Sequence, residues 1–265
     1  MAAAEQGTVV TETGEKLNKV EALKRAKDGL DVWADIFRYA QEGFAAIPEE
    51  DFVRMRWFGI YQQLPNNGHF MFRIRIPNGF LTPAQLREIA AIAADHGRGF
   101  ADITTRQNIQ LHWLTIQSLP DVLARLERVQ LVSKFACGDT PRNVVGCPLA
   151  GYLAHEIIDA APANAAVNQM FLDAGKELSN LPRKFKTSIA GCHLHCHQPQ
   201  INDIGLFGVQ RKNPATGAAE TGYGVLVGGG LSTTPHMGQG LRVFLRPDQV
   251  NAFCKGIAHI FRDQG

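Results

Sequence analysis

The chain has 265 residues, of which 45% are hydrophobic and 20% charged, and this composition excludes a disordered polymer. It contains 27 Lys and Arg against 25 Asp and Glu, a net charge of +2, so its overall charge does not favour nucleic acid or a membrane surface as a partner. Five cysteines in no dense framework and an N-terminus without an apolar leader favour a cytoplasmic enzyme or binding protein over a secreted one.

The first half of the chain predicts helices followed by a small mixed sheet. Apolar residues recur at helical spacing over 17–46, which predicts one or two helices that wrap a neighbour. The elements expected next are strands at 57–64 and 69–76 around the turn 65–68, a helix from Thr82–Pro83 to Gly97, an extended stretch over 100–116, a helix starting at Ser118 and Pro120, and a last strand at 131–137. This order, ββαβαβ, predicts an α+β sandwich with helices on one sheet face.

The character of the sequence changes after Asp139, and we expect a boundary between two units near 135. The elements expected in the second unit are a helix near 164–178 capped by Asn164, a strand in KFKTSIA, a Cys/His-rich loop, a glycine-dense segment and a final helix over 247–262.

Three predicted strands carry rows of basic and amide side chains on one face, because side chains alternate along a strand. The rows are Arg73 and Arg75; Arg106, Asn108, Gln110 and His112; and Lys184, Lys186 and Ser188; on the middle strand Ile109, Leu111 and Trp113 are expected on the core face. An ordinary amphipathic sheet facing water is the alternative. No row contains an acid, however, and adjacent like charges repel unless a counter-charge lies between them. We therefore favour an anion site, to which Arg142 in a proline-flanked loop would contribute a fourth contact.

Two further segments are chemically ambiguous. Cys192 and Cys196 lie among three histidines, and this spacing suits zinc or an iron–sulfur cluster. It equally allows two partly buried thiols, with the histidines binding anions or backbone carbonyls. The glycines at 228–230 could cradle phosphate or let the backbone approach a bulky cofactor, although they match no nucleotide-binding fingerprint.

Seven stretches, in order, resemble the N-terminal half of the sirohaem-dependent nitrite and sulfite reductases of the ferredoxin-linked assimilatory type. They are RWFGIYQQ, HFMFRIRIPNG, DITTRQNIQLHWL, CGDTPRNVVGCPLAG, LPRKFKTSIAGC, INDIGLFG and GYGVLVGGGLS. The resemblance implies an α+β fold with a ferredoxin-like half-domain sandwich over 51–135, after an N-terminal helical extension over 1–50. The first half of an α+β sirohaem and 4Fe-4S domain would follow over 136–265.

The resemblance also implies a reaction and roles for individual residues. The reaction is the six-electron reduction of nitrite to ammonia or of sulfite to sulfide, with reduced ferredoxin as donor, at sirohaem coupled to a 4Fe-4S cluster. The substrate anion would be bound by Arg75, Arg142, Lys184 and Lys186. The sirohaem would be contacted by Arg73, Arg106, Asn108, Gln110, His112, Gly228, Gly229 and Gly230. A lysine at 186 is similar to the sulfite-reducing type, but members called nitrite reductases also carry it.

The chain departs from this family in its cysteines. The family's cluster ligands form C-x5-C followed by C-x3-C in the second half of a protein about twice as long. Here Cys192 and Cys196 have the C-x3-C spacing at the pseudo-symmetric position of the first half, and the sequence contains no C-x5-C. We expect the cluster ligands to come mainly from a missing C-terminal half, through truncation or a second polypeptide. The alternatives are an additional metal at Cys192 and Cys196, a non-catalytic sirohaem-binding module, and a Cys/His metal-binding structural domain.

Overall fold

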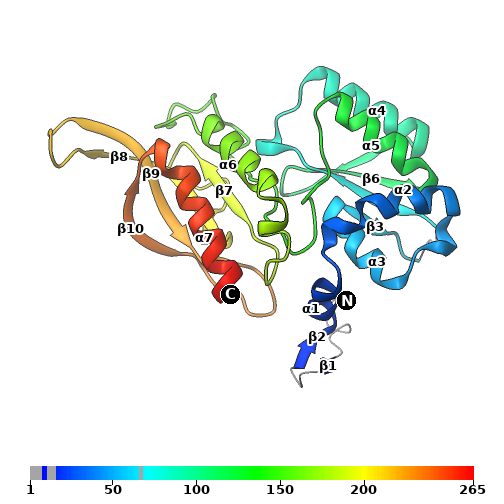
Figure 1. Ribbon diagram of the computed structural model, residues 1–265. Coiled ribbons are helices and arrows are strands. Elements are labelled where there is room, and N and C mark those ends of the chain that lie inside the picture. Colours follow the sequence, from blue (N-terminus) through cyan, green and yellow to red (C-terminus); the bar gives the residue numbers. More distant parts are fainter. Residues whose placement is uncertain (1–7, 11–15, 66–67) are drawn as a thin grey trace.

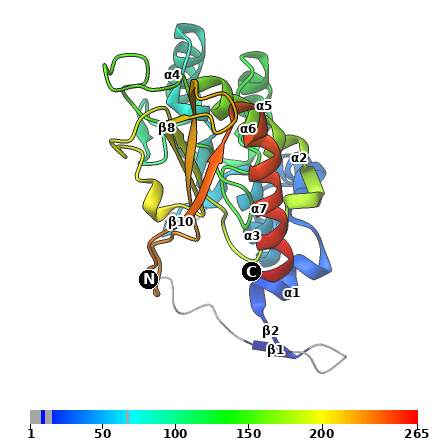
Figure 2. The same ribbon diagram turned by 90° about the vertical axis from the view of Figure 1, so that its left-hand side faces the viewer.

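The computed structural model describes residues 8–10, 16–65 and 68–265. Residues 1–7 and 11–15 of the predicted extension and Asn66 and Asn67 of the predicted turn lie outside this part of the chain. Two four-stranded sheets lie side by side, each with its own helices, so the predicted α+β class is confirmed (Figures 1 and 2). A small β1–β2 hairpin and helix α1 project from one end (Figure 1).

The strands are β1 (Thr8–Val10), β2 (Lys16–Asn18), β3 (Ile60–Gln62), β4 (Phe70–Ile74), β5 (Ala101–Ile103), β6 (Ile109–Leu114), β7 (Thr187–Ala190), β8 (Ile204–Lys212), β9 (Ala219–Val227) and β10 (Gln239–Leu245). The α-helices are α1 (Lys19–Ala26), α2 (Trp33–Glu42), α3 (Glu49–Arg54), α4 (Pro83–His96), α5 (Leu119–Arg128), α6 (Ala161–Asp173) and α7 (Val250–Gln264). Short 3₁₀ turns are η1 (Gly29–Val32), η2 (Phe44–Ala46), η3 (Met55–Phe58), η4 (Pro77–Gly79), η5 (Ile116–Ser118), η6 (Gly175–Leu178), η7 (Pro199–Ile201) and η8 (Pro247–Gln249).

The first sheet is antiparallel in the order β3-β4-β6-β5, and α4 and α5 cover one of its faces (Figure 1). Phe70, Phe72 and Ile74 of β4 are fully buried on this face, as their alternation predicts. Helix α4 begins where the sequence predicts it, because Thr82 and Gln85 form a reciprocal capping box.

Two of the predicted strands are wrong in this region. The stretch 100–116 is not continuous but folds into the β5–β6 hairpin, because Thr104 and Asn108 hydrogen-bond across a turn in which Gln107 has φ 58°. Residues 131–137 form no strand and make a single bridge from Val132 to Arg75, since the chain turns at Phe135, whose φ is 60°. The observed order is therefore ββαββα rather than ββαβαβ.

Trp113 was expected in the core, and the structure places it elsewhere. The pairing of β4 with β6 shifts between Phe72–Leu111 and Phe70–Leu114, and Trp113 has φ 69° at this irregularity. Leu114 is therefore the buried residue, while Trp113 is half-buried against the guanidinium of Arg98, 3.5 Å from its ring centroid.

The second sheet has the order β10-β9-β8-β7, with β7 parallel to β8 and the other pairs antiparallel. Helices α6 and α7 pack together over it (Figures 1 and 2). Helix α6 starts three residues before the expected Asn164, whose side chain is not a cap but donates to Ile189 O at 2.9 Å. The predicted final helix is confirmed as η8 and α7.

The segment 135–146 joins the two sheets. It forms parallel bridges to the strand edge of the second unit at Pro141–Phe185 and Val145–Ser188. At its other end, the Phe135 amide donates to the carbonyl oxygen of Trp57 in η3, next to the first sheet. This segment therefore lies where side chains from both sheets meet. Among the described residues, none of the helices is both long and apolar enough to cross a membrane.

Candidate anion site

A cavity of about 220 Å³ lies where the two sheets meet. Its lining residues are Arg73, Thr104, Thr105, Arg106, Asn108, Ala136, Arg142, Lys184 and Lys186. Five of these nine are basic and none of them is acidic. The structure thus brings Arg142, Lys184 and Lys186 together from two separate segments, and adds Arg73 and Arg106 from β4 and the β5–β6 turn.

Arg73 contributes a guanidinium from the middle of β4. Its Nη1 donates to Cys137 Sγ at 2.8 Å, and its guanidinium lies 5.8 Å from the ring centroid of Tyr61. Arg73 Nε is buried and has no hydrogen-bond partner among the described residues. A buried donor without a partner is costly, so this atom is available for a ligand oxygen.

Lys184 and Lys186 lie directly before β7 and project to the same side. Lys184 is exposed, and within the described residues its amino group has no hydrogen-bond partner; Lys186 Nζ donates to Ile201 O at 2.5 Å. Although the residue as a whole is exposed, partial burial at the cavity lowers the pKa of Lys184, and the nearby guanidinium of Arg142 lowers it further. Burial also lowers the pKa of Lys186, although the carboxylate of Asp203 opposes this shift. Both lysines lose their protons at a lower pH than a solvated lysine would.

Arg142 and Arg106 are held by backbone carbonyls. Arg142 donates from Nε and Nη2 to Gly138 O at 3.1 and 2.7 Å. These bonds tie the guanidinium to the backbone of the loop that carries Arg142. Arg106 donates to Asn202 Oδ1 at 2.8 Å and to Asn143 O at 2.8 Å, so it links the first sheet to the second unit. Arg106 Nε, like Arg73 Nε, is buried and unpaired among the described residues.

Arg75 was predicted to bind the substrate anion, and the structure places it elsewhere. It lies directly after β4 and, like Arg73, contacts residues 135–142, but it is 0% exposed and does not line the cavity. Segment 135–142 covers it, and its donors are taken by three carbonyls and an amide oxygen. Arg73 therefore lies at the cavity wall, where Arg75 was expected.

Of the other side chains predicted to contact sirohaem, Asn108 lines the cavity, whereas Gln110 and His112 do not. Asn108 lines the cavity and accepts a hydrogen bond from the Ile76 amide at 3.3 Å. Gln110 Nε2 contacts Met71 Sδ at 3.2 Å. His112 Nε2 lies 3.0 Å from Asp102 Oδ2 without hydrogen-bond geometry. Neither of these two side chains lines the cavity.

The glycines at 228–230 support the cavity from behind. Gly229 N donates to Asn202 O at 3.0 Å, and Asn202 is the residue that holds Arg106. A Cβ on Gly229 would lie 2.2 Å from Gln200 O, whereas a Cβ on Gly230 would meet nothing within 4 Å. The glycine requirement is thus one of close backbone packing at Gly229, and one of a left-handed backbone at Gly228, whose φ is 77°.

We predict that Gly229→Ala lowers the free energy of unfolding by roughly 1–3 kcal/mol, because the backbone of η7 must move away from the new methyl group. Gly230→Ala is the matched control and is expected to change stability little, since its methyl group has open space. Chemical denaturation of both variants measures the difference, and equal stabilities would contradict the packing argument.

The predicted metal pair, Cys192 and Cys196, lies in the loop that follows β7. Cys192 is buried and Cys196 exposed. Burial raises the pKa of the Cys147 thiol, as do its neighbours Cys196 and Cys192, so the structure brings in a third thiol that the sequence analysis left unassigned. Even so, the described part of the chain holds no group of three or more His, Cys, Asp or Glu side chains that could bind a metal ion. Metal binding by Cys192 and Cys196 stays a prediction.

The sequence analysis missed several contributors to the cavity. Thr104 and Thr105 line it from the turn that replaced the predicted continuous strand. Cys137 and Tyr61 both contact the guanidinium of Arg73. Burial raises the pKa of Tyr61, and the nearby Cys137 raises it further. Alternating periodicity could not reveal these residues, because they lie in turns or on a neighbouring strand.

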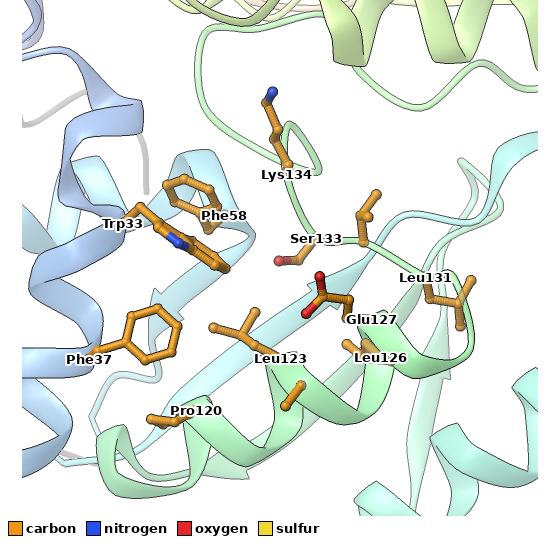
Figure 3. Close-up of a pocket in the computed structure, with 12 residues that line it drawn as sticks. Trp33, Phe37, Phe58, Pro120, Leu123, Leu126, Glu127, Leu131, Ser133 and Lys134 are labelled. Atoms are coloured by element: carbon orange, nitrogen blue, oxygen red, sulfur yellow. The ribbon is translucent and has the colours of Figure 1, made fainter.

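A second cavity, of about 340 Å³, lies between α2 and α5 and has a different character (Figure 3). Trp33, Phe37, Phe58 and Leu123 form its apolar walls, and Glu127 and Lys134 are its charged lining residues (Figure 3). It contains none of the predicted site residues. Because anion chemistry needs converging donors, we assign the site to the smaller basic cavity.

Comparisons with known proteins identify the family of the two units. Residues 61–129 match the family model of the nitrite/sulfite reductase ferredoxin-like half domain, and residues 137–265 match that of the nitrite and sulphite reductase 4Fe-4S domain. The chain is 38% identical over 267 residues to the assimilatory ferredoxin-dependent nitrite reductase of Haloferax mediterranei, covering 92% of this chain and 45% of that protein. It is 36% identical over 270 residues to a ferredoxin sulfite reductase of Mycobacterium tuberculosis, covering 95% and 47%.

Solved structures give the same result. The NirA protein of Mycobacterium tuberculosis superposes with a TM-score of 0.83 at 35% identity, covering 95% of this chain and 48% of that one. Dissimilatory sulfite reductase I has a TM-score of 0.64 at 14% identity, which shows a shared fold alone. The chain spans about half the length of the curated relatives that it matches.

Proposed function

Because the chain belongs to the nitrite and sulfite reductase family, we propose that it supplies the anion-binding half of a ferredoxin-dependent reductase whose substrate is nitrite or sulfite. The observation that carries this proposal is the convergence of Arg73, Arg106, Arg142, Lys184 and Lys186 on one cavity. The division into an extension over 1–50 and units over 51–135 and 136–265 is proposed with it, as is a cytoplasmic location.

The cavity suits an oxyanion on electrostatic grounds. An anion that approaches an electron-rich centre is repelled unless cations neutralise its charge. Here the guanidinium groups are fixed by carbonyl oxygens before any ligand arrives, so they need not reorganise during a reaction. Lys184 is the cation most free to follow the anion, because its amino group has no partner among the described residues.

Sirohaem fits the residues present. Its carboxylates need buried donors, and Arg73 Nε and Arg106 Nε are such donors, both unpaired within the described residues. We propose that these arginines and Asn108 hold the macrocycle beside the cavity. When bound, sirohaem would pass electrons from the external donor to the substrate, since redox chemistry belongs to the cofactor.

A 4Fe-4S cluster does not fit the described residues on their own, because these residues form no group of three or more possible metal ligands. We derive no step from the cluster. We propose instead that its ligands come mainly from polypeptide outside these 265 residues and that reduced ferredoxin, named in the relatives, is the donor.

The two lysines can also serve as proton donors. Loss of oxygen from nitrite or sulfite as water consumes protons, and an ammonium group whose pKa is lowered gives up its proton more readily. Lys184 and Lys186 line the same cavity, so either can donate to a bound oxygen.

We predict that nitrite affinity falls as the pH rises toward 10.5, the ordinary lysine pKa, and that the fall begins below it. The lowered pKa values mean that Lys184 and Lys186 become neutral, and stop attracting the anion, at a lower pH than solvated lysines do. Nitrite is a suitable probe because it stays a monoanion throughout this range. Titrations at several pH values measure the effect, and a Lys184→Arg/Lys186→Arg variant should flatten the curve. A flat curve in the unmodified protein would contradict the prediction.

The function is tested by oxidation of reduced ferredoxin or viologen in the presence of nitrite or sulfite, with the purified protein carrying sirohaem. Ammonium or sulfide should appear in proportion to the donor consumed. Sirohaem uptake without turnover, even with a complementary half added, would favour the non-catalytic binding module. One tightly bound zinc and no iron would favour the structural metal domain.

A further inference from the structure

Arg75 is a completely buried cation that is bound entirely by neutral groups. Its Nε donates to Asn168 Oδ1 at 2.7 Å, Nη1 to Pro141 O at 2.9 Å and Phe135 O at 3.2 Å, and Nη2 to Arg142 O at 3.2 Å. Among the described residues, its side chain contacts no carboxylate. A buried charge is expensive unless hydrogen bonds compensate for it, so all of these contacts are needed to retain an arginine here.

Arg75 and the partners of its side chain belong to three different parts of the molecule. Arg75 itself directly follows β4 of the first sheet, and its amide donates to Val132 O at 2.9 Å. Asn168 lies on α6, which covers the second sheet, and Phe135, Pro141 and Arg142 lie on the connecting segment. One guanidinium therefore fixes this segment relative to both sheets.

The same segment carries one cavity-lining arginine and a thiol that contacts a second cavity-lining arginine. Cys137 accepts a hydrogen bond from Arg73, and Arg142 lines the cavity while it donates back to Ala136 O and Gly138 O. The backbone of 135–142 is thus held from behind by Arg75 and from the cavity side by Arg142. Movement of this backbone would displace Arg142 without removing it.

We propose that Arg75 is a positioning residue: its guanidinium fork holds the backbone of residues 135–142 so that Arg142 lines the cavity and Cys137 stays in contact with Arg73, and it does not itself contact the anion. The part of this inference that concerns anion affinity rests on the proposed function. A lysine in its place would keep the charge but could not reach three carbonyls and Asn168 together, because it has one compact donor group.

The first test is a double-mutant cycle read out by sulfite affinity. Arg75→Lys should weaken sulfite binding roughly tenfold in the otherwise unchanged chain, and should have little further effect when Arg142 is already alanine. A residue with a merely structural role would add the same loss in both backgrounds, so additive losses would overturn the proposal. Arg128→Lys, an exposed arginine-to-lysine change on α5, is the matched control.

The second test does not need a ligand and so separates this inference from the proposed function. Hydrogen exchange should accelerate at the amides of Arg142 and Phe185 in Arg75→Lys and remain unchanged at β8 and β9, because only the connecting segment is released. If Arg75→Lys does not fold, Asn168→Ala removes one contact, while Asn168→Asp retains an acceptor and should restore slow exchange. Unchanged exchange in both Arg75→Lys and Asn168→Ala would refute the positioning role. If exchange accelerates but the unmodified chain binds no sulfite, the proposed function fails and the positioning of the segment stands.

Discussion

Replacing Lys184 with methionine is expected to weaken sulfite binding by roughly ten- to a hundredfold while leaving the protein folded. Lys184 lines the basic cavity, and no described residue hydrogen-bonds its amino group, so a bound anion would be its main partner. Methionine has a similar length and removes only the charge. Calorimetric titration with sulfite measures the loss.

The control for this variant is Arg183→Met. Arg183 is exposed, precedes Lys184 in the chain and does not line the cavity, so the same loss of one positive charge should change the affinity far less. Equal losses in the two variants would indicate a general attraction of the surface for anions and would contradict a specific site.

Replacing Arg106 with leucine is expected to lower the free energy of unfolding by roughly 2–4 kcal/mol. Arg106 donates to Asn202 Oδ1, Asn143 O and Thr187 O. Leucine would leave Asn202 Oδ1 and Asn143 O without this donor where the two sheets meet, whereas Thr187 O would keep its bond from the Val145 amide. Chemical denaturation measures the change.

Arg73→Leu is the matched comparison for Arg106→Leu, because both arginines line the cavity but Arg73 makes one side-chain hydrogen bond, to Cys137. We expect Arg73→Leu to impair anion binding with a much smaller loss of stability. If Arg106→Leu proved no less stable than Arg73→Leu, the assignment of Arg106 as a link between the sheets would be wrong.

Local sequence signals predicted much of the fold because the governing interactions are local. Thr82, Pro83 and Gln85 define the start of α4, and the alternation of Phe70, Phe72 and Ile74 defines the core face of β4. The errors arose at positive-φ residues, Gln107, Trp113 and Phe135, which end or kink an extended chain. None of the three is glycine, so composition gave no signal for the hairpin, the bulge or the turn.

The candidate site was predictable in its chemistry but not in its geometry. The acid-free rows of basic residues indicated an anion site, and the structure brings members of all three rows to one cavity. Alternation alone treats Arg73 and Arg75 as equivalent, because it places both on the same face of the predicted strand. Only the path of residues 135–142, which cover Arg75 and leave Arg73 open, distinguishes a cavity residue from a buried support.

The most direct test of the account is the number of sulfite ions that one chain binds, measured by calorimetry before and after the combined change Arg73→Met, Lys184→Met and Lys186→Met. The account predicts a single saturable site in the unmodified chain and none in the triple variant, with native secondary structure retained. Saturable binding of unchanged affinity in the folded triple variant would show that the anion binds elsewhere and would contradict the assignment of this cavity.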